Sequence, residues 1–192
     1  MKTQTFGIGV LVLTAFFTAL LTVGAQGAAP KIDGKIVAKE YANTFKHTES
    51  GVTLNWQIVG DTISFGLESP STGWTGMGFN PTGDKKDGAD MYMFLFENNK
   101  LVARDDIMTK ATGAPKLDTD EGGKNDILAS SGTLNDKGMV LEFSRKLNTG
   151  DKTDQPILAG KSNKVLIAMG ESPSFTKAHK RGERWELEIV LK

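Results

Sequence analysis

The feature that most limits the fold is a pair of alternating segments at 52–59 and 62–68, joined by Gly60 and Asp61. In VTLNWQIV and again in TISFGLE, hydrophobic and polar residues alternate with a period of two. Such alternation is typical of strands with one buried face, and Gly-Asp is a tight-turn signal. The two segments therefore predict a β-hairpin with one hydrophobic face.

Further short runs with strand character follow the hairpin, at 74–79, 90–96, 139–144, 164–170 and 184–191. The run ADMYMFLF is hydrophobic on both faces, so we expect a central strand or one wall of a pocket. The polar, Gly-rich segment 107–126 is expected to be a long loop, and no sustained helical period with caps occurs beyond the N-terminal segment. This pattern predicts an all-β sandwich or barrel.

The N-terminal 25 residues have the order of an export signal: Lys2, a hydrophobic run, and the small residues Val23-Gly24-Ala25. We expect this segment, 1–25, to be a cleaved signal peptide. An uncleaved anchor is the alternative, because the hydrophobic run is long enough to span a bilayer. Residues 26–34 are interpreted as a linker and 35–192 as one domain of typical size. The expected location is periplasmic or extracellular.

Composition excludes several kinds of site. The chain has no cysteine, which rules out covalent c-type haem, thiolate zinc sites and iron–sulfur clusters. His47 and His179 are the only histidines, too few for a multi-histidine metal site from this chain alone. The formal net charge is zero, which gives no indication of nucleic-acid binding. No Ser-His-Asp spacing or pair of carboxylates stands out, so we do not expect an enzyme.

Seven motifs follow one another along the chain: LNWQIVGDTISFGL, GWTGMGFNPTG, GADMYMF, the Asp105-Asp106 pair after LVAR, GGKNDILASSG, FSRKLNTGDKTDQPI and AMGESPSFTKAHKRG. Their order and spacing, over roughly residues 52–191, resemble the DOMON domain family. The resemblance implies an immunoglobulin-like antiparallel β-sandwich. It also implies a ligand, which is haem b in the cytochrome-type members and a sugar or another small molecule in others.

In the haem-binding members that this chain resembles, the iron lies between the two sheets, with a Met ligand before the G-A-D strand and a His ligand in the last loop. His179 stands at the histidine position, whereas Lys86 stands at the methionine position. A lysine ligand must lose its proton, which burial and the charge of the iron both favour. Met77 or Met91 could supply the second ligand or line the pocket instead, as could Met93.

Each of these residues also has an ordinary structural interpretation. The methionines could fill the core, and Lys86 and His179 could be solvated loop residues. The basic group near the C-terminus could pair with haem propionates, dock an acidic redox partner, or simply be solvated; it consists of Lys177, Lys180, Arg181 and Arg184.

Two acidic loops raise the question of calcium. One holds Asp118, Asp120 and Asp126, and the other Asp84 and Asp87. Carboxylate oxygens suit calcium, but neither loop has the EF-hand spacing, so calcium is not expected.

The sequence therefore favours an exported domain that binds haem b without covalent attachment and transfers electrons to a partner protein or a membrane electron carrier. Two alternatives remain open. One is a haem-free DOMON-type binding module for a sugar or other small ligand, and the other is an interaction domain of an exported complex.

Overall fold

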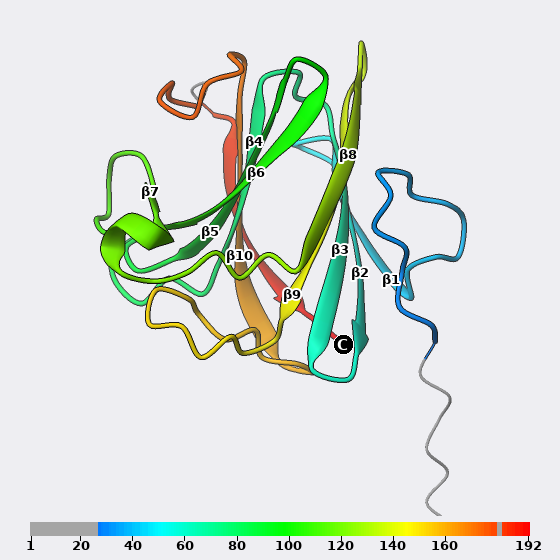
Figure 1. Ribbon diagram of the computed structural model, residues 1–192, viewed down its shortest axis with the longest axis horizontal. Coiled ribbons are helices and arrows are strands. Elements are labelled where there is room, and N and C mark those ends of the chain that lie inside the picture. Colours follow the sequence, from blue (N-terminus) through cyan, green and yellow to red (C-terminus); the bar gives the residue numbers. More distant parts are fainter. Residues whose placement is uncertain (1–26, 180–181) are drawn as a thin grey trace, which may run out of the picture.

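The computed structural model describes residues 27–179 and 182–192, which form two antiparallel β-sheets packed face to face (Figure 1). The five-stranded sheet has the order β1 (Asn43–His47), β2 (Val52–Val59), β3 (Thr62–Ser69), β9 (Gly138–Lys146) and β8 (Ala129–Asn135). The six-stranded sheet has the order β11 (Arg184–Val190), β10 (Ser162–Gly170), β4 (Trp74–Phe79), β5 (Asp90–Glu97), β6 (Lys100–Ile107) and β7 (Lys116–Leu117). The predicted all-β sandwich is confirmed. The predicted signal peptide lies outside the described residues and stays a prediction.

The hairpin predicted from the alternating segments is β2–β3, with Val59 opposite Thr62 across the turn. Gly60 in this turn has a φ of 63°, in the left-handed region that glycine adopts without steric cost. The hydrophobic residues of both strands point between the sheets, as the period of two requires.

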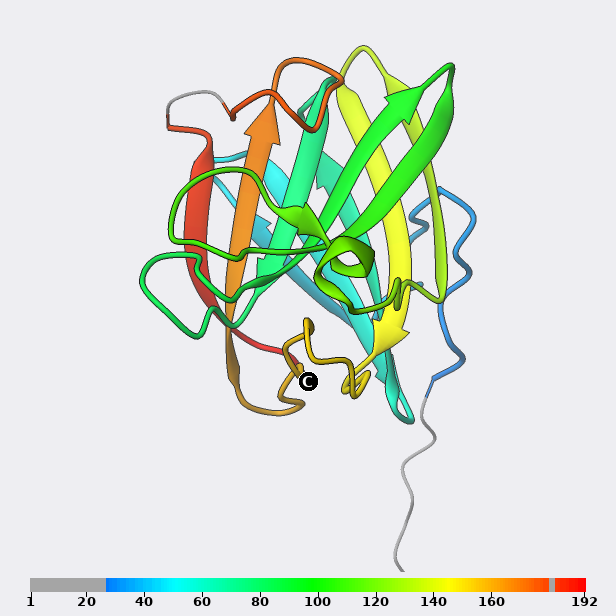
Figure 2. The same cartoon turned by 60° about the vertical axis from the view of Figure 1, so that its left-hand side comes forward.

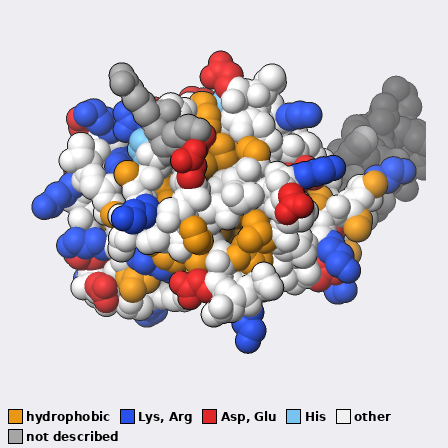
Figure 3. Space-filling model, turned by 90° about the horizontal axis from the view of Figure 1, so that it is seen from above, with side chains coloured by type: hydrophobic (Ala, Val, Ile, Leu, Met, Phe, Trp, Pro, Cys, Tyr) orange, Lys and Arg blue, Asp and Glu red, His pale blue; other side chains and the backbone are white. Residues whose placement is uncertain are grey.

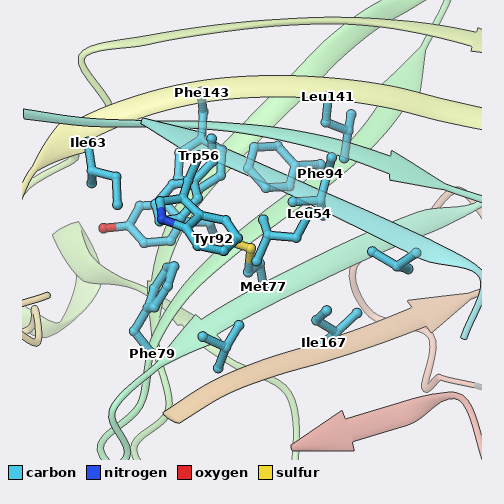
Figure 4. Close-up of a cluster of buried hydrophobic side chains, with 14 of the residues drawn as sticks. Leu54, Trp56, Ile63, Met77, Phe79, Tyr92, Phe94, Leu141, Phe143 and Ile167 are labelled. Carbon is cyan, nitrogen blue, oxygen red and sulfur yellow. The ribbon is translucent and has the colours of Figure 1, made fainter. Parts of the chain in front are cut away.

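The space between the sheets is filled by aromatic side chains from both layers (Figure 4). The Phe143 ring lies 5.1 Å from the Phe65 ring and 5.0 Å from the Tyr92 ring, centroid to centroid. Phe79 and Phe94 are also fully buried there. Close packing of such large side chains supplies most of the hydrophobic stabilisation of a sandwich without disulfides.

Three edge strands were not expected from the sequence: β1, β7 and β8. β1 and β8 are the two edge strands of the five-stranded sheet, and β7 is an edge strand of the six-stranded sheet. β8 has the sequence ASSGTLN, with no buried residue, so it carries no hydrophobic alternation. The expected long loop at 107–126 contains β7 and a short 3₁₀-helix, η1 (Asp118–Glu121). Edge strands are held by hydrogen bonds to one neighbour, which a hydrophobicity pattern does not report.

The segment that precedes β1 packs against the outer face of the five-stranded sheet (Figure 1). Gln57 Nε2 donates a 2.7 Å hydrogen bond to the carbonyl of Ala28. The buried carboxylate of Glu142 accepts hydrogen bonds from the backbone N–H groups of residues 33–35. Part of the segment interpreted as a linker thus contacts the sheet. Within the described residues, no helix is long and hydrophobic enough to cross a membrane.

Candidate functional site

The six-stranded sheet has a second buried hydrophobic surface, on the side that faces away from the five-stranded sheet. Alternation along β5 directs Tyr92 into the core and directs Met91 and Met93 to this outer face. The fully or nearly buried residues of this outer cluster are Trp74, Ala89, Met91, Met93, Leu95 and Met108. The outer face of an antiparallel sheet is commonly polar and solvated, so this hydrophobic surface requires a cover.

Loops from three parts of the chain provide that cover (Figure 2). In the β10–β11 loop, Phe175 packs against the outer cluster, and the carbonyl of Lys177 accepts a 3.1 Å hydrogen bond from Trp74 Nε1. In the β4–β5 loop, Lys86 Nζ donates a 2.7 Å hydrogen bond to the carbonyl of Gly113, which lies in the β6–β7 loop. The loops that carry His179 and Lys86 therefore cover the same face of the sheet.

Two glycines on β4 shape the surface beneath these loops. Gly76 is paired with Met93 and Gly78 with Met91. A Cβ atom at Gly76 would lie 2.7 Å from Met93 Sδ, and a Cβ at Gly78 would lie 2.3 Å from Met91 Sδ. The thioether groups of Met91 and Met93 thus lie directly over the backbone of β4. If these flexible side chains move aside, a flat ligand can approach the strand closely at this point.

Charged groups border the cluster. Arg104 binds Asp106 through two hydrogen bonds of 3.0 and 2.8 Å, and its guanidinium carbon lies 4.8 Å from the centre of the Phe175 ring. Burial lowers the pKa of Lys86, and the nearby positive charge of Arg184 lowers it further. The Lys86 amine therefore loses its proton more easily than a solvated lysine does.

The structure brings some of the predicted site residues together and separates others. Met91 lies on the outer face, and Lys86 and His179 belong to two of the loops that cover it, with His179 partly buried. Met77 has no exposed surface and points into the core between the sheets, so it lies on the opposite side of the sheet from Met91 (Figure 4). Arg181 lies outside the described residues.

The expected position of haem between the two sheets does not agree with the structure. Aromatic and aliphatic side chains with almost no exposed surface fill that space, and a haem there would have to displace them. The described residues form two buried hydrophobic clusters. The core cluster lies between the two sheets, whereas the outer cluster is covered by loops.

Three residues of this site were missed in the sequence: Met108, Phe175 and Arg104. Met108 follows β6, and Phe175 lies in a polar loop, so neither belongs to an alternating pattern. Their contribution depends on how the loops fold back over the sheet, which the local sequence does not specify. Arg104 lies on the outer face of β6, where a charged residue is common. The sequence does not indicate that Phe175 packs beside it.

A separate cleft of about 510 Å³ opens at one end of the sandwich. Viewed onto that end, hydrophobic side chains lie between charged ones (Figure 3). The cleft is lined by the partly exposed Trp185 and by the carboxylate side chains of Glu49, Glu171 and Glu183, together with the β3–β4 turn. Its size is within the range of small-molecule sites.

Comparison with known proteins agrees with this architecture. The cytochrome b domain of pyranose dehydrogenase from Coprinopsis cinerea superposes with a TM-score of 0.52 at 13% identity, over 76% of this chain and 80% of that domain. The cytochrome domain of Myriococcum thermophilum cellobiose dehydrogenase gives 0.45, also at 13% identity, over 77% and 88% of the two chains. At this identity the first likeness shows a shared fold.

Sequence comparison identifies a relative and a family. MOXD1 homolog 2 from Drosophila melanogaster is 29% identical over 111 residues, which are 58% of this chain. The match spans only 14% of the length of that relative. A family model of the DOMON domain matches residues 48–170, more than half of the chain, so the protein belongs to the DOMON domain family.

Proposed function

We propose that this domain binds one haem b non-covalently on the outer face of the six-stranded sheet and acts in electron transfer rather than as an enzyme. The observation that carries the proposal is the buried outer cluster, covered by the loops that hold His179 and Lys86. The cytochrome b domain fold of the pyranose dehydrogenase neighbour supports it. Haem would supply the one-electron chemistry, while the protein supplies ligands, a dry pocket and charged groups around it.

The residues present fit a haem group by their chemistry. Met91, Met93 and Trp74 offer a soft, hydrophobic surface, and Gly76 and Gly78 let a ring approach the backbone. To admit the ring, the two methionine side chains have to leave the glycines, and the covering loops have to move outward. Phe175 would then close over the ligand and exclude water.

His179 and Lys86 are the residues that would hold the haem iron. An imidazole nitrogen is a common ligand of haem iron. Lys86 is suited to be the second ligand, since its lowered pKa makes the neutral amine accessible. Arg104 and Arg184 border the same face and are the proposed partners of the propionates, through charge-assisted hydrogen bonds.

Lys177 and Arg184 are exposed basic residues of the β10–β11 region. They also suit an acidic redox partner, either a protein or a membrane electron carrier, because complementary charge accelerates encounter. This domain would act outside the cytoplasm, with residues 1–25 as its export signal.

An absorption spectrum tests the proposal. The full chain is produced in an export host supplied with haem, and spectra are recorded before and after reduction with dithionite. We expect a Soret band that shifts on reduction, with sharp α and β bands typical of low-spin haem. A spectrum without haem, unchanged after addition of hemin, would exclude haem binding.

Matched variants identify the ligands. His179→Ala should abolish the low-spin spectrum, whereas His47→Ala should not, because His47 bonds Ser50 in the β1–β2 turn. Lys86→Ala should convert the iron to a high-spin form, and Lys137→Ala, at an exposed turn, should leave the spectrum unchanged. Loss of low-spin character in the two control variants would remove the ligand assignment.

The end cleft supports a second candidate, a sugar-binding module. Sugars stack on aromatic rings and hydrogen-bond to carboxylates, and the cleft presents Trp185 beside glutamates. Saturable quenching of tryptophan fluorescence by an oligosaccharide, lost in Trp185→Ala, would favour this function if no haem binds.

A further inference from the structure

A cluster of buried aspartates lies at the other end of the sandwich from the cleft. Asp90 begins β5 and Asp105 lies near the end of β6, and both point between the sheets. Asp118 opens η1, and Asp154 lies in the β9–β10 loop. η1 and the β9–β10 loop are neighbours at this end of the molecule (Figures 1 and 2). The only buried cation among them is Arg145, near the end of β9.

Each aspartate is at least nine-tenths buried, yet the cluster has many oxygens without a partner. Asp90 uses one oxygen for Arg145 and for the N–H of Gln155, and its Oδ1 has no hydrogen bond. Asp105 Oδ2 accepts a 2.7 Å bond from the N–H of Asp126, and its Oδ1 has none.

The other two aspartates are less satisfied still. No donor has hydrogen-bond geometry to either oxygen of Asp118 or of Asp154, although the Thr153 and Asp154 side chains lie close enough to affect the pKa of Asp118, which has no exposed surface. The one charge contact is from Arg145 Nη2 to Asp154 Oδ2, at 3.6 Å. Buried polar atoms are nearly always paired, so this number of unpaired oxygens in one place indicates a missing positive partner.

The charges do not balance with the protein groups alone. The cluster holds four buried carboxylates and one guanidinium, and the Asp126 carboxylate beside them also has a buried oxygen without a partner. A buried carboxylate without a counter-charge costs several kcal/mol. Either protons or a cation must therefore neutralise the cluster.

The geometry suits a cation. One oxygen from each of Asp90, Asp105 and Asp154 lies within 4.8 Å of the others. Oxygens on opposite sides of a calcium ion lie up to about 5 Å apart, given calcium–oxygen bonds of about 2.4 Å. For three oxygens up to 4.8 Å apart, the central point lies up to about 2.8 Å from each, so small movements of the side chains would bring all three to calcium–oxygen bond length without rearrangement of the strands.

We propose that Asp90, Asp105 and Asp154 form a calcium site, with Asp118 completing its carboxylate shell. Only oxygen ligands are present, which selects a hard cation and disfavours zinc or copper. Calcium is favoured over magnesium because it accepts several carboxylates at variable angles, whereas magnesium demands octahedral geometry and retains water. Arg145 is a positioning residue, which holds the second oxygens of Asp90 and Asp154.

The site would join separate parts of the chain. It links β5 and β6 of one sheet to η1 and to the β9–β10 loop, with Arg145 from the other sheet. A calcium ion there would therefore stabilise the end of the sandwich and fix the β9–β10 loop. This proposal is independent of haem, because the site lies between the sheets rather than on the outer face.

Calcium binding to the full chain is measured after treatment with a chelator and its removal. We expect one calcium per chain by equilibrium dialysis, and a melting temperature that rises by about 5–10 °C at saturating calcium. Magnesium at the same concentration should have a much smaller effect. No bound calcium and no change in melting temperature would overturn the proposal.

Variants locate the ion. Asp154→Asn and Asp118→Asn should each weaken calcium binding at least about tenfold while keeping a folded circular dichroism spectrum. Asp120→Asn is the matched control, since Asp120 lies on the same η1 but is exposed. Equal affinity in all three variants would mean that calcium binds elsewhere on the surface, and would overturn the site.

The same variants distinguish a cluster that calcium neutralises from one that protons neutralise. If protons alone neutralise the cluster, an asparagine in place of Asp154 or Asp118 should raise the melting temperature without calcium, and calcium should not affect the wild-type protein. That pair of results would also overturn the proposal.

Discussion

Two of the sites with buried carboxylates among the described residues are constructed in opposite ways. At Glu142, the carboxylate accepts hydrogen bonds from the N–H groups of Asp33, Gly34 and Lys35 at 3.0, 2.6 and 3.1 Å. Its other oxygen accepts the Tyr41 hydroxyl at 2.8 Å. In the aspartate cluster, by contrast, Arg145 contacts two of the four carboxylates, and most of the carboxylate oxygens have no donor.

The difference shows two ways to place negative charge inside a sandwich. The donors around Glu142 belong to the backbone of the N-terminal segment, so the site is complete once that segment docks on the sheet. Among the described residues, two backbone N–H groups donate to the aspartate cluster, so protons or a bound cation would have to balance the rest of its charge. Stability at Glu142 should therefore be insensitive to solution conditions, whereas stability at the cluster should depend on calcium and pH.

The largest effect is expected for Arg145→Met. Without calcium, this change removes the only buried cation of the cluster and should lower the free energy of unfolding by about 3–5 kcal/mol. Saturating calcium should recover part of the loss, because the ion binds the folded state. Urea unfolding with and without chelator measures both values. A variant as stable as the wild type in chelator would indicate that the carboxyls are already neutral.

Glu142→Ala should lower the free energy of unfolding by about 3 kcal/mol, since it leaves several buried donors without an acceptor. Calcium should not change this loss, in contrast to the effect at Arg145. Glu40→Ala is the control: Glu40 also accepts backbone hydrogen bonds in the N-terminal segment, but they are exposed. A calcium-dependent loss in Glu142→Ala would show that the two sites are coupled.

The comparison also shows what the sequence can and cannot predict. The β2–β3 hairpin and the central strand β5 follow from alternation and from hydrophobic runs, because each pattern is local. The aspartate cluster does not: Asp90, Asp105, Asp118 and Asp154 are spread over more than sixty residues, with no motif spacing. Only the order of strands in the two sheets brings them to one end of the sandwich.

The haem-site prediction also rests partly on local patterns, which the sequence shows, and partly on strand pairing, which it does not show. Alternation indicates that Met91 and Met93 share a face of one strand. It does not indicate that Met77, on the neighbouring strand, points to the other face, because that depends on the pairing of Met77 with Tyr92. The choice of His179 and Lys86 came from the family resemblance, and the loops that carry them do cover one face. The position of a haem could not be predicted, because the sequence does not show that large side chains fill the space between the sheets.

A pH series should show the protonation of the aspartate cluster as a change in the free energy of unfolding. The folded-state pKa values of Asp118 and Asp105 are raised to about 7 and about 9, mainly by burial. The stability that protonation provides is complete below the unfolded-state pKa near 4 and is lost as the pH rises through these folded-state values. In chelator, the protein should therefore be more stable at pH 5 than at pH 8.

Calcium should reverse this trend, because the ion binds the ionised carboxylates and replaces the protons. Asp105→Asn should flatten the profile in chelator, since it removes the group with the highest raised pKa. A chelator profile that already rises from pH 5 to pH 8 would contradict the description of the cluster as incompletely neutralised.

The smallest effect is expected for Tyr41→Phe. The change removes one donor from Glu142 and leaves the three backbone donors in place, so the free energy of unfolding should fall by about 1 kcal/mol. Burial and the neighbouring Glu142 carboxylate raise the pKa of Tyr41, so the hydroxyl stays a donor throughout the pH 5–8 series. The loss should therefore be the same at both ends of the series and with or without calcium. Denaturant midpoints at pH 5 and pH 8 measure it. A loss that changes with pH would mean that the Glu142 site shares the dependence of the aspartate cluster, and the contrast between the two sites would then fail.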